Sequence, residues 1–429
     1  MDATLIFTLI LLLFAFLMAV GAPIFAALGV ASLVGMFLQG GMNALNVIPS
    51  ILHRGLASYT LICIPLFILM GEVMARTSIG GKLYHLFYVW LHRLPGGLSI
   101  ASVGSSAVFG AMSGVSVAGA ATIGRFAIPE MLKRGYDPGL AGGSVAAAGS
   151  LALLIPPSIG FVLYGEMADQ SIGKLFTAAI LPGLLLTGLM MLYLYILVKM
   201  RPHMAPGGQE KISARERWSA LRHVWPACLM ILAVLGTIYF GIATPTEAAG
   251  VGAFAAFAIA TIRGEMRIRL AIDILRSTIV TSGMILLILA SALLFGYIMT
   301  RLMIPQKVVG MVAELRQPSW VILCASMLFL VAIGMFLDIV SVILITTPIL
   351  LPIMVAAGYD PIWFGVVMII ACEMAVITPP VGLNLYVIKG IAPEISLADI
   401  IKGTMPFVLV ELACIIILTI FPSIVMVLI

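Results

Sequence analysis

Long, nearly uncharged apolar stretches dominate the chain and restrict the folds open to it. The stretches Leu5–Val20 and Val408–Leu428 contain one charged side chain between them, Glu411. A helix that spans a bilayer needs about 20 apolar residues. Only 10% of the 429 residues are charged, whereas soluble domains carry roughly 25%. We therefore predict an all-α polytopic membrane protein whose surroundings are the lipid bilayer.

The sequence disfavours several other classes of protein. The first apolar stretch follows Met1 and Asp2 without a basic segment, so we expect a retained helix rather than a signal peptide. The net charge of +5 comes from basic residues in short loops, which predicts no nucleic-acid partner. The five cysteines form no metal-ligand spacing, and no zinc, hydrolase or nucleotide-binding motif stands in a suitable context. We expect neither an enzyme nor an organic cofactor.

An internal duplication organises the chain. The tetrapeptide Gly135–Pro138 (GYDP) recurs 223 residues later as Gly358–Pro361, and the double proline Pro156–Pro157 recurs at the same spacing as Pro379–Pro380. Further co-linear matches lie upstream of both tetrapeptides. A repeat of this kind predicts two structurally equivalent halves.

Each predicted half contains a re-entrant helical hairpin followed by a broken helix. We assign residues 1–200 to the first half, with its hairpin at about 98–134 and its broken helix at about 138–170. Residues 201–223, rich in proline and glycine, form a linker. The second half covers 224–429, with its hairpin at about 319–355 and its broken helix at about 361–392.

The distribution of positive charge sets the predicted orientation. One of the two possible orientations places all but five of the 23 lysines and arginines on one face, and such a face is cytoplasmic. The linker is then cytoplasmic, both termini are periplasmic, and the two hairpins open to opposite sides. Repeats of inverted topology are typical of secondary transporters.

The interruptions are the candidate functional sites. Non-helical backbone at membrane depth is costly unless it lines a cavity. Free carbonyl groups at helix ends suit a cation, and free N–H groups suit a carboxylate. Small residues could instead simply pack helices together. The first candidate site is the hairpin tip and the break that follows it: Ser113, Gly114, Ser116, Gly149, Ser150 and Pro156.

The second candidate site contains an acid within an apolar hairpin. Ionisable groups at such positions are usually functional, although a structural ion pair is the alternative for Asp338. The set consists of Asp338, Ser341, Thr378, Pro379, Gly382 and Asn384. Glu373, at the position equivalent to Ser150, is a possible coupling carboxylate or a buried strut. We expect a structural role for Glu411. Arg301 could steer an anion, contact a partner or anchor a helix at the interface.

The motifs resemble those of one transporter family. Ser113–Gly124 (SGVSVAGAATIG), Leu154–Ile159 (LIPPSI), Ser171–Phe176 (SIGKLF), Pro245–Ala249 (PTEAA) and Thr378–Asn384 (TPPVGLN) are together similar to the large membrane subunit of tripartite ATP-independent periplasmic (TRAP) transporters. The resemblance covers nearly the whole chain.

The resemblance implies an elevator-type carrier of the bacterial inner membrane. Both hairpins and both broken helices would form a transport domain, and the remaining helices would form a scaffold. The implied partners are a small four-helix membrane subunit and a periplasmic substrate-binding protein. Substrates would be carboxylates such as C4-dicarboxylates or sialic acids, or sulfonates or ectoines. By position, one co-transported sodium ion would bind at Ser113, Ser116 and backbone near 149–156. The other would bind at Asp338, Ser341 and backbone near 378–382.

Three alternatives remain open from the sequence. A stand-alone sodium–dicarboxylate symporter would need no binding protein. A receptor or assembly subunit would carry no flux, and a gated channel would conduct faster than a carrier.

Overall fold

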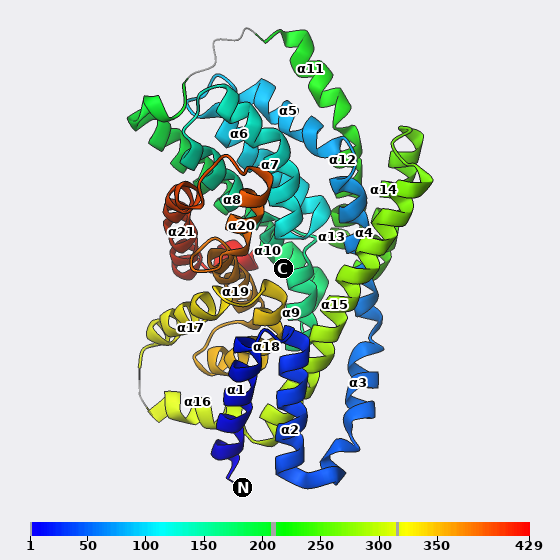
Figure 1. Ribbon diagram of the computed structural model, residues 1–429, viewed down its shortest axis with the longest axis vertical. Helices are drawn as coiled ribbons and strands as arrows, with labels where there is room; N and C mark the ends of the chain where they lie inside the picture. Colours follow the sequence, from blue (N-terminus) through cyan, green and yellow to red (C-terminus); the bar gives the residue numbers. More distant parts are fainter. Residues whose placement is uncertain (1, 207–211, 315–316) are drawn as a thin grey trace.

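The computed structural model describes residues 2–206, 212–314 and 317–429, and every regular element in these ranges is helical (Figure 1). The part of the linker at 207–211 lies outside the described residues. The first half contains α1 (Ala3–Ala19), α2 (Ile24–Leu45), α3 (Ile48–Leu56), η1 (Tyr59–Ile62), α4 (Cys63–Ala75), α5 (Ile79–Leu91), α6 (Gly97–Ser113), α7 (Ser116–Lys133), α8 (Pro138–Leu154), α9 (Ile159–Ala168) and α10 (Ile172–Met200).

The linker and second half continue the helical pattern. They contain η2 (Pro202–Met204), α11 (Ala214–His223), α12 (Trp225–Ile231), the π-helical η3 (Leu232–Gly236), α13 (Thr237–Tyr239), α14 (Pro245–Ile262), α15 (Ile268–Arg301), α16 (Ile304–Glu314), α17 (Ser319–Gly334), α18 (Ile339–Ala356), α19 (Pro361–Val376), α20 (Leu383–Ile391), α21 (Leu397–Ile420) and α22 (Ser423–Met426). The helix pairs α6–α7 and α17–α18 occupy the ranges predicted for the hairpins, and the helix pairs α8–α9 and α19–α20 are interrupted at the double prolines as predicted.

The helices are long and apolar enough for a polytopic membrane protein. Within the described ranges, six helices meet the length and hydropathy of a membrane span, and up to nine do so if each bent pair is one span. The pair α8–α9 is bent by 43° at its break. The prediction of an all-helical, multi-pass membrane protein is confirmed.

Each copy of the repeated tetrapeptide ends one helix and begins the next. Gly135 and Gly358 adopt left-handed backbone conformations, with φ of 77° and 91°, and they end the hairpin helices that precede them. Asp137 then caps α8 by accepting from Leu140 N at 2.9 Å, and Asp360 caps α19 by accepting from the amides of its first turn. The proline that follows each aspartate suits the first position of a helix.

One group of helices forms a long wall along one side of the molecule. In Figure 1, α3 and α4 follow one another along α15 and both pack on it, α14 packs on α4, and α2 packs on α15. Ser291 Oγ in α15 donates to Phe25 O in α2 at 2.7 Å. Thr246 Oγ1 in α14 donates to Tyr59 O in η1 at 3.3 Å.

The hairpins and broken helices form a second group, and two further helices join it. A Cβ atom on Gly143 of α8 would overlap the backbone of Gly403 in α21, and a Cβ atom on Gly403 would overlap the backbone of Gly139 in α8, so neither position has room for a side chain. A Cβ atom on Gly183 of α10 would lie 2.9 Å from Ile155, in the first break. The resemblance assigned all the remaining helices to a scaffold. The structure instead packs α10 and α21 with the hairpins, because small residues allow close backbone contact.

The two broken helices run in opposite directions. The first turns of α8 and α21 lie together, since a Cβ atom on Gly139 would lie 3.0 Å from Asp399 O. The start of α19 instead meets the end of α21, where Trp363 Nε1 donates to Leu418 O at 3.0 Å. Relative to α21, α8 is therefore parallel and α19 is antiparallel.

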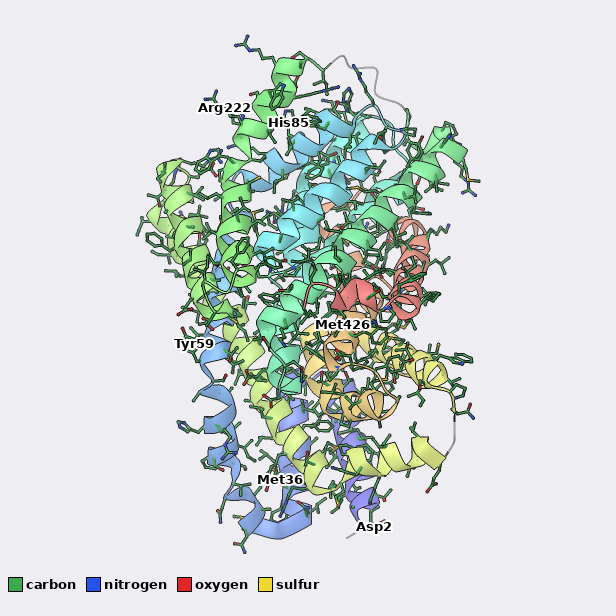
Figure 2. All side chains as sticks on the ribbon, turned by 180° about the vertical axis from the view of Figure 1, so that it is seen from behind. Asp2, Met36, Tyr59, His85, Arg222 and Met426 are labelled. Carbon is green, nitrogen blue, oxygen red and sulfur yellow. The ribbon has the colours of Figure 1, made fainter. Side chains whose placement is uncertain are left out.

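Each hairpin also contacts a short amphipathic helix of its own half: α5 packs on α6, and α16 packs on α18. Figure 2 shows His85 of α5 and Arg222 of α11 at one end of the long axis, and Asp2 and Met36 at the other. Met426, near the C-terminus, lies between these ends.

Candidate functional site

The tip of the first hairpin touches the break between α8 and α9. Gly114 has a left-handed conformation with φ of 62°, and a Cβ atom there would lie 2.7 Å from Pro157 O. Ile159 N, at the start of α9, faces Gly114 O at 3.5 Å. Four helix ends therefore meet: α6 and α8 present carbonyl groups, and α7 and α9 present N–H groups.

Two serine hydroxyl groups at this junction are buried without a partner. Ser113 is 1% exposed and Ser158 is 0% exposed, and neither Oγ atom has a hydrogen-bond partner among the described residues. Buried polar atoms are normally satisfied, so each exception needs an explanation. A cation bound beside the carbonyl ends of α6 and α8 would supply one.

A hydrogen bond joins the two interruptions. Asn384 Nδ2 donates to Ser116 Oγ at 2.9 Å and to Ala146 O at 3.2 Å. Ser116 opens α7, and Asn384 stands in the first turn of α20. Two helix N-termini thus meet at this bond, and such ends attract negative charge.

The remaining residues of the first predicted set are Gly149, Ser150 and Pro156, and they do not all face the hairpin tip. Pro156 is buried in the break itself. Gly149 allows α8 to approach α7, since its Cβ atom would lie 2.9 Å from Ala120 Cα. Ser150 Oγ donates to Ala147 O and to Glu411 Oε1. The hydroxyl of Ser150 therefore contacts α21 rather than the hairpin tip.

At the second hairpin, Asp338 is the N-cap of α18. Its Oδ1 accepts from Ser341 Oγ at 2.5 Å, and its Oδ2 accepts from Ser341 N at 3.2 Å. Asp338 is half-buried and Ser341 is fully buried. The capping bonds account for the position of the carboxylate, and each of its oxygens keeps a further lone pair.

The second hairpin tip also packs beside the second break. A Cβ atom on Gly334, at the end of α17, would lie 2.6 Å from Ala375 Cβ in α19. Thr378 Oγ1 donates to Met374 O, and Gly382 has φ of 53°. Pro379 is half-buried. This break is more open than the first, because Val381 is 40% exposed and Pro156–Ser158 are all buried.

Asn384 of the second predicted set, and the separately predicted Arg301 and Glu373, each have surroundings of their own. Asn384 was grouped with Asp338, but its side chain is bonded to the first hairpin. Arg301 is exposed at the C-terminal end of α15, where its carbonyl accepts from Gln39 Nε2 at 3.3 Å. Glu373 is fully buried in α19, on the side facing α21.

Ser158 was not among the residues predicted from the sequence, and Glu411 was given only a structural role. Ser158 directly follows the double proline, and a hydroxyl at a backbone break was the available signal. Glu411 is the only charged residue in an otherwise apolar stretch, which could have marked it as functional. No cluster of three or more histidine, cysteine, aspartate or glutamate side chains suited to a metal occurs in the described part of the chain.

Comparison with known proteins identifies the family. A family model for the DctM component of tripartite ATP-independent periplasmic transporters matches residues 11–424. The isethionate TRAP transporter permease protein DctMQ of Oleidesulfovibrio alaskensis is 36% identical, over 96% of this chain and 64% of its own length. The C4-dicarboxylate TRAP transporter large permease protein DctM of Pseudomonas aeruginosa is 36% identical over 85% of each chain. The ectoine TRAP transporter large permease protein TeaC of Halomonas elongata is 31% identical over 95% of each.

Solved structures share the fold at low sequence identity. The YdaH transporter of Alcanivorax borkumensis superposes with a TM-score of 0.61, at 16% identity over 89% of each chain. MtrF of Neisseria gonorrhoeae superposes with a TM-score of 0.53, at 13% identity over 97% of this chain and 94% of its own. The family match covers nearly all of the chain and includes both interruptions. The chain therefore belongs to the DctM component family of tripartite ATP-independent periplasmic transporters, and it is a transporter permease rather than an enzyme.

Proposed function

We propose that this permease carries a small organic anion into the cell, driven by sodium. The observation that carries the proposal is the junction at Ser116 and Asn384. Two helix N-termini converge there, and the unpartnered hydroxyls of Ser113 and Ser158 lie in the neighbouring tip and break. Converging N-termini favour an anion, and carbonyl ends with free hydroxyls favour a cation.

The proposed sodium sites follow the two interruptions. The first would use the hydroxyls of Ser113 and Ser158 with carbonyl groups at the end of α8. The second would use Asp338, Ser341 and the backbone between Thr378 and Gly382. Sodium would neutralise the carbonyl dipoles and the Asp338 carboxylate, which would prepare the junction for the substrate. Each charge that moves inward across about 100 mV supplies roughly 2.3 kcal/mol.

The opposite directions of α8 and α19 support inverted repeats and alternating access. In this proposal the hairpins, the broken helices, α10 and α21 move as one body against the wall of α2, α4, α14 and α15. The basic linker end and the end holding Asp2 are far apart (Figure 2). This separation suits a cytoplasmic linker and a periplasmic N-terminus in the bacterial inner membrane. The C-terminal region near Met426 lies between the two ends, so this view does not support the periplasmic C-terminus expected from the sequence.

The names of the relatives suggest the substrate class. They include permeases for isethionate, C4-dicarboxylates and ectoine, which all contain a carboxylate or sulfonate group. We therefore propose a small carboxylate or sulfonate as substrate. The DctMQ relative extends beyond the matched region, and we propose a small membrane subunit and a periplasmic binding protein as partners.

Reconstitution tests the proposal directly. Proteoliposomes with this chain, the small subunit and an inward sodium gradient should accumulate a labelled C4-dicarboxylate or isethionate only when the binding protein is added. Potassium in place of sodium should remove the accumulation. Uptake by this chain alone would instead favour the stand-alone symporter, and rapid downhill flux without a gradient would favour a channel. Binding of substrate without flux in every condition would favour a receptor subunit.

Removing two hydroxyl groups of the first site should weaken sodium coupling. We expect the double variant Ser113→Ala/Ser158→Ala to need several-fold more sodium for half-maximal uptake, because the two unpartnered hydroxyls proposed as sodium ligands are lost. Ser144→Ala is a suitable control, since among the described residues the Ser144 hydroxyl bonds only Ala141 O, within α8. An unchanged sodium requirement in the double variant would remove these hydroxyls from the site.

A further inference from the structure

Basic side chains line a cavity at the linker end of the molecule. The cavity has a volume of about 470 Å³ and lies between α5 and α11, which pack against each other. Lys82 and His85 line it from α5, and Arg215, Ser219 and His223 line it from α11. Figure 2 shows His85 at this end of the long axis. Two helices that are far apart in the sequence therefore supply one basic surface.

A second cavity, of about 560 Å³, adjoins the first. Arg215, Ser219 and His223 line both cavities, and Trp218 and Arg222 complete the lining of the second. Arg215, Ser219 and Arg222 follow one another at intervals of four and three residues, so they lie on one face of α11. The two cavities are therefore parts of one basic surface.

The positive charge of this surface is only partly compensated. Lys82 Nζ lies 3.8 Å from Glu265 Oε1. Neither Arg215 nor Arg222 forms an ion pair with another described residue. Glu216 is the only acid that lines either cavity in the described part of the chain, so the lining keeps a net positive charge. Because guanidinium groups bind phosphate through two parallel hydrogen bonds, the lining suits a phosphate group.

Neutral polar groups and open space complete the cavity. His223 Nδ1 donates to Ser219 O at 2.6 Å, which leaves Nε2 of the same ring for another partner. That nitrogen can accept from a hydroxyl group or, when protonated, donate to a phosphate oxygen. Ala220 is the buried residue of the lining. Because its side chain is a single methyl group, the basic side chains surround space that a ligand can enter.

The cavities lie where the chain enters the bilayer. Residues Ser213–His223 contain four charged side chains, whereas Val224–Tyr239 contain none. The helix pair bends by 44° at this boundary, and Trp225 is exposed directly after it. Tryptophan is enriched where a membrane meets water. Arg222 directly precedes the boundary, so the basic surface stands at the depth of the lipid headgroups.

An exposed apolar face continues from the cavities along α12. Trp225, Leu229 and Leu232 are exposed and follow one another at intervals of four and three residues, so they share one face of the helix. Trp218 and Leu221 extend the exposed apolar surface onto α11. A soluble phosphate compound would leave this face unused, whereas a lipid would cover it with its acyl chains.

We propose that the two cavities bind the phosphate headgroup of an anionic lipid, whose acyl chains lie along α12. Basic residues at a membrane surface attract anionic headgroups, and each contributes about fivefold in affinity. A bound lipid would contact both α5 and α11 and would stabilise their packing. The site is built from the linker helix and an amphipathic helix, so it does not depend on the sodium coupling proposed above.

Quenching of tryptophan fluorescence by lipids with brominated acyl chains is the test. The full chain is placed in phosphatidylcholine nanodiscs, and brominated phosphatidylglycerol is added in rising fractions. Trp218 and Trp225 report lipid beside the cavities, and Trp218→Phe identifies the share of the signal that comes from Trp218. We expect half-maximal quenching at a lower fraction of brominated phosphatidylglycerol than of brominated phosphatidylcholine, because only the former has an anionic headgroup.

Two double variants locate the effect. Arg215→Gln/Arg222→Gln should raise the fraction of phosphatidylglycerol needed by at least about tenfold, because two basic contacts are lost. Arg267→Gln/Arg269→Gln is the matched control. It removes two exposed charges at the same end of the molecule, since the nearby Glu265 accepts from Ser78 at the start of α5. Neither residue lines the described cavities, and the control should change the fraction by less than about twofold.

Three results would overturn the proposal. Equal quenching by the two lipids would show that the headgroup is not recognised. An equal loss in both double variants would show general attraction to the membrane surface rather than a site at the cavities. Displacement of the brominated lipid by millimolar inorganic phosphate, but not by chloride at the same ionic strength, would show that the cavities take soluble phosphate. If Arg215→Gln/Arg222→Gln does not fold, the headgroup comparison and the phosphate competition on the unmodified protein still decide the question.

Discussion

Replacing Asp338 with asparagine should abolish sodium-driven uptake while leaving the protein folded in the membrane. Asparagine caps a helix about as well as aspartate, so α18 should still begin at Ile339. Only the negative charge beside the second break is lost. Without it, sodium has no anionic ligand at this site, and the driving force is no longer coupled to the substrate. Asp338→Ala, which also removes the cap at a cost of about 1 kcal/mol, should be equally inactive and less stable.

Asp360→Asn is the matched control for this prediction. Asp360 caps α19 in the same manner, by accepting from the amides of Ile362 and Trp363, but it lies at the far end of that helix from the break. The measurement is uptake of labelled substrate into proteoliposomes at equal protein content, with the melting temperature recorded alongside. Normal uptake by Asp338→Asn would reduce the role of Asp338 to helix capping.

A side chain at Gly114 should also abolish uptake, for a different physical reason. The positive φ of Gly114 costs a non-glycine residue about 1–2 kcal/mol. In addition, its Cβ atom would stand 2.7 Å from the backbone oxygen of Pro157, which cannot rotate away as a flexible side chain could. Gly114→Val should separate the hairpin tip from the break, and both candidate oxygens at Ser113 and Ser158 would lose their common site.

Gly188→Ala serves as the control, because a Cβ atom on Gly188 of α10 would meet nothing within 4 Å. We expect Gly114→Val to lose uptake and the thermal stabilisation given by sodium, whereas Gly188→Ala should keep both. Sodium-dependent uptake that survives in Gly114→Val would show that contact between the tip and the break is not needed for transport.

Much of the architecture follows from local patterns in the sequence. The scarcity of charge predicted a polytopic helical protein, and the structure has helices that fit. The repeated GYDP tetrapeptide and the double prolines predicted where each hairpin ends and where each helix breaks. These features depend on residues within one or two turns of each other, such as Asp137 and Leu140, so a short stretch of sequence contains the information.

The sequence was a poorer guide to which side chains come together in the candidate site. The sequence places Asn384 in the second interruption, yet its side chain bonds Ser116, 268 residues away. It offers Ser150 as a ligand of the first site, yet the hydroxyl of Ser150 contacts Glu411 on α21. In both cases the residue lies at the predicted interruption, and the direction of its side chain depends on which helix packs beside it.

The sequence by itself determined the membrane environment, the duplication, the ends of the helices and the positions of the breaks, because hydropathy, capping and proline act locally along the chain. Only the tertiary structure decided that α10 and α21 pack with the hairpins, that Asn384 joins the two interruptions, and that Ser150 bonds Glu411. Those contacts depend on which small residues let two distant backbones approach. Many glycines in this chain could do so, and packing selects among them.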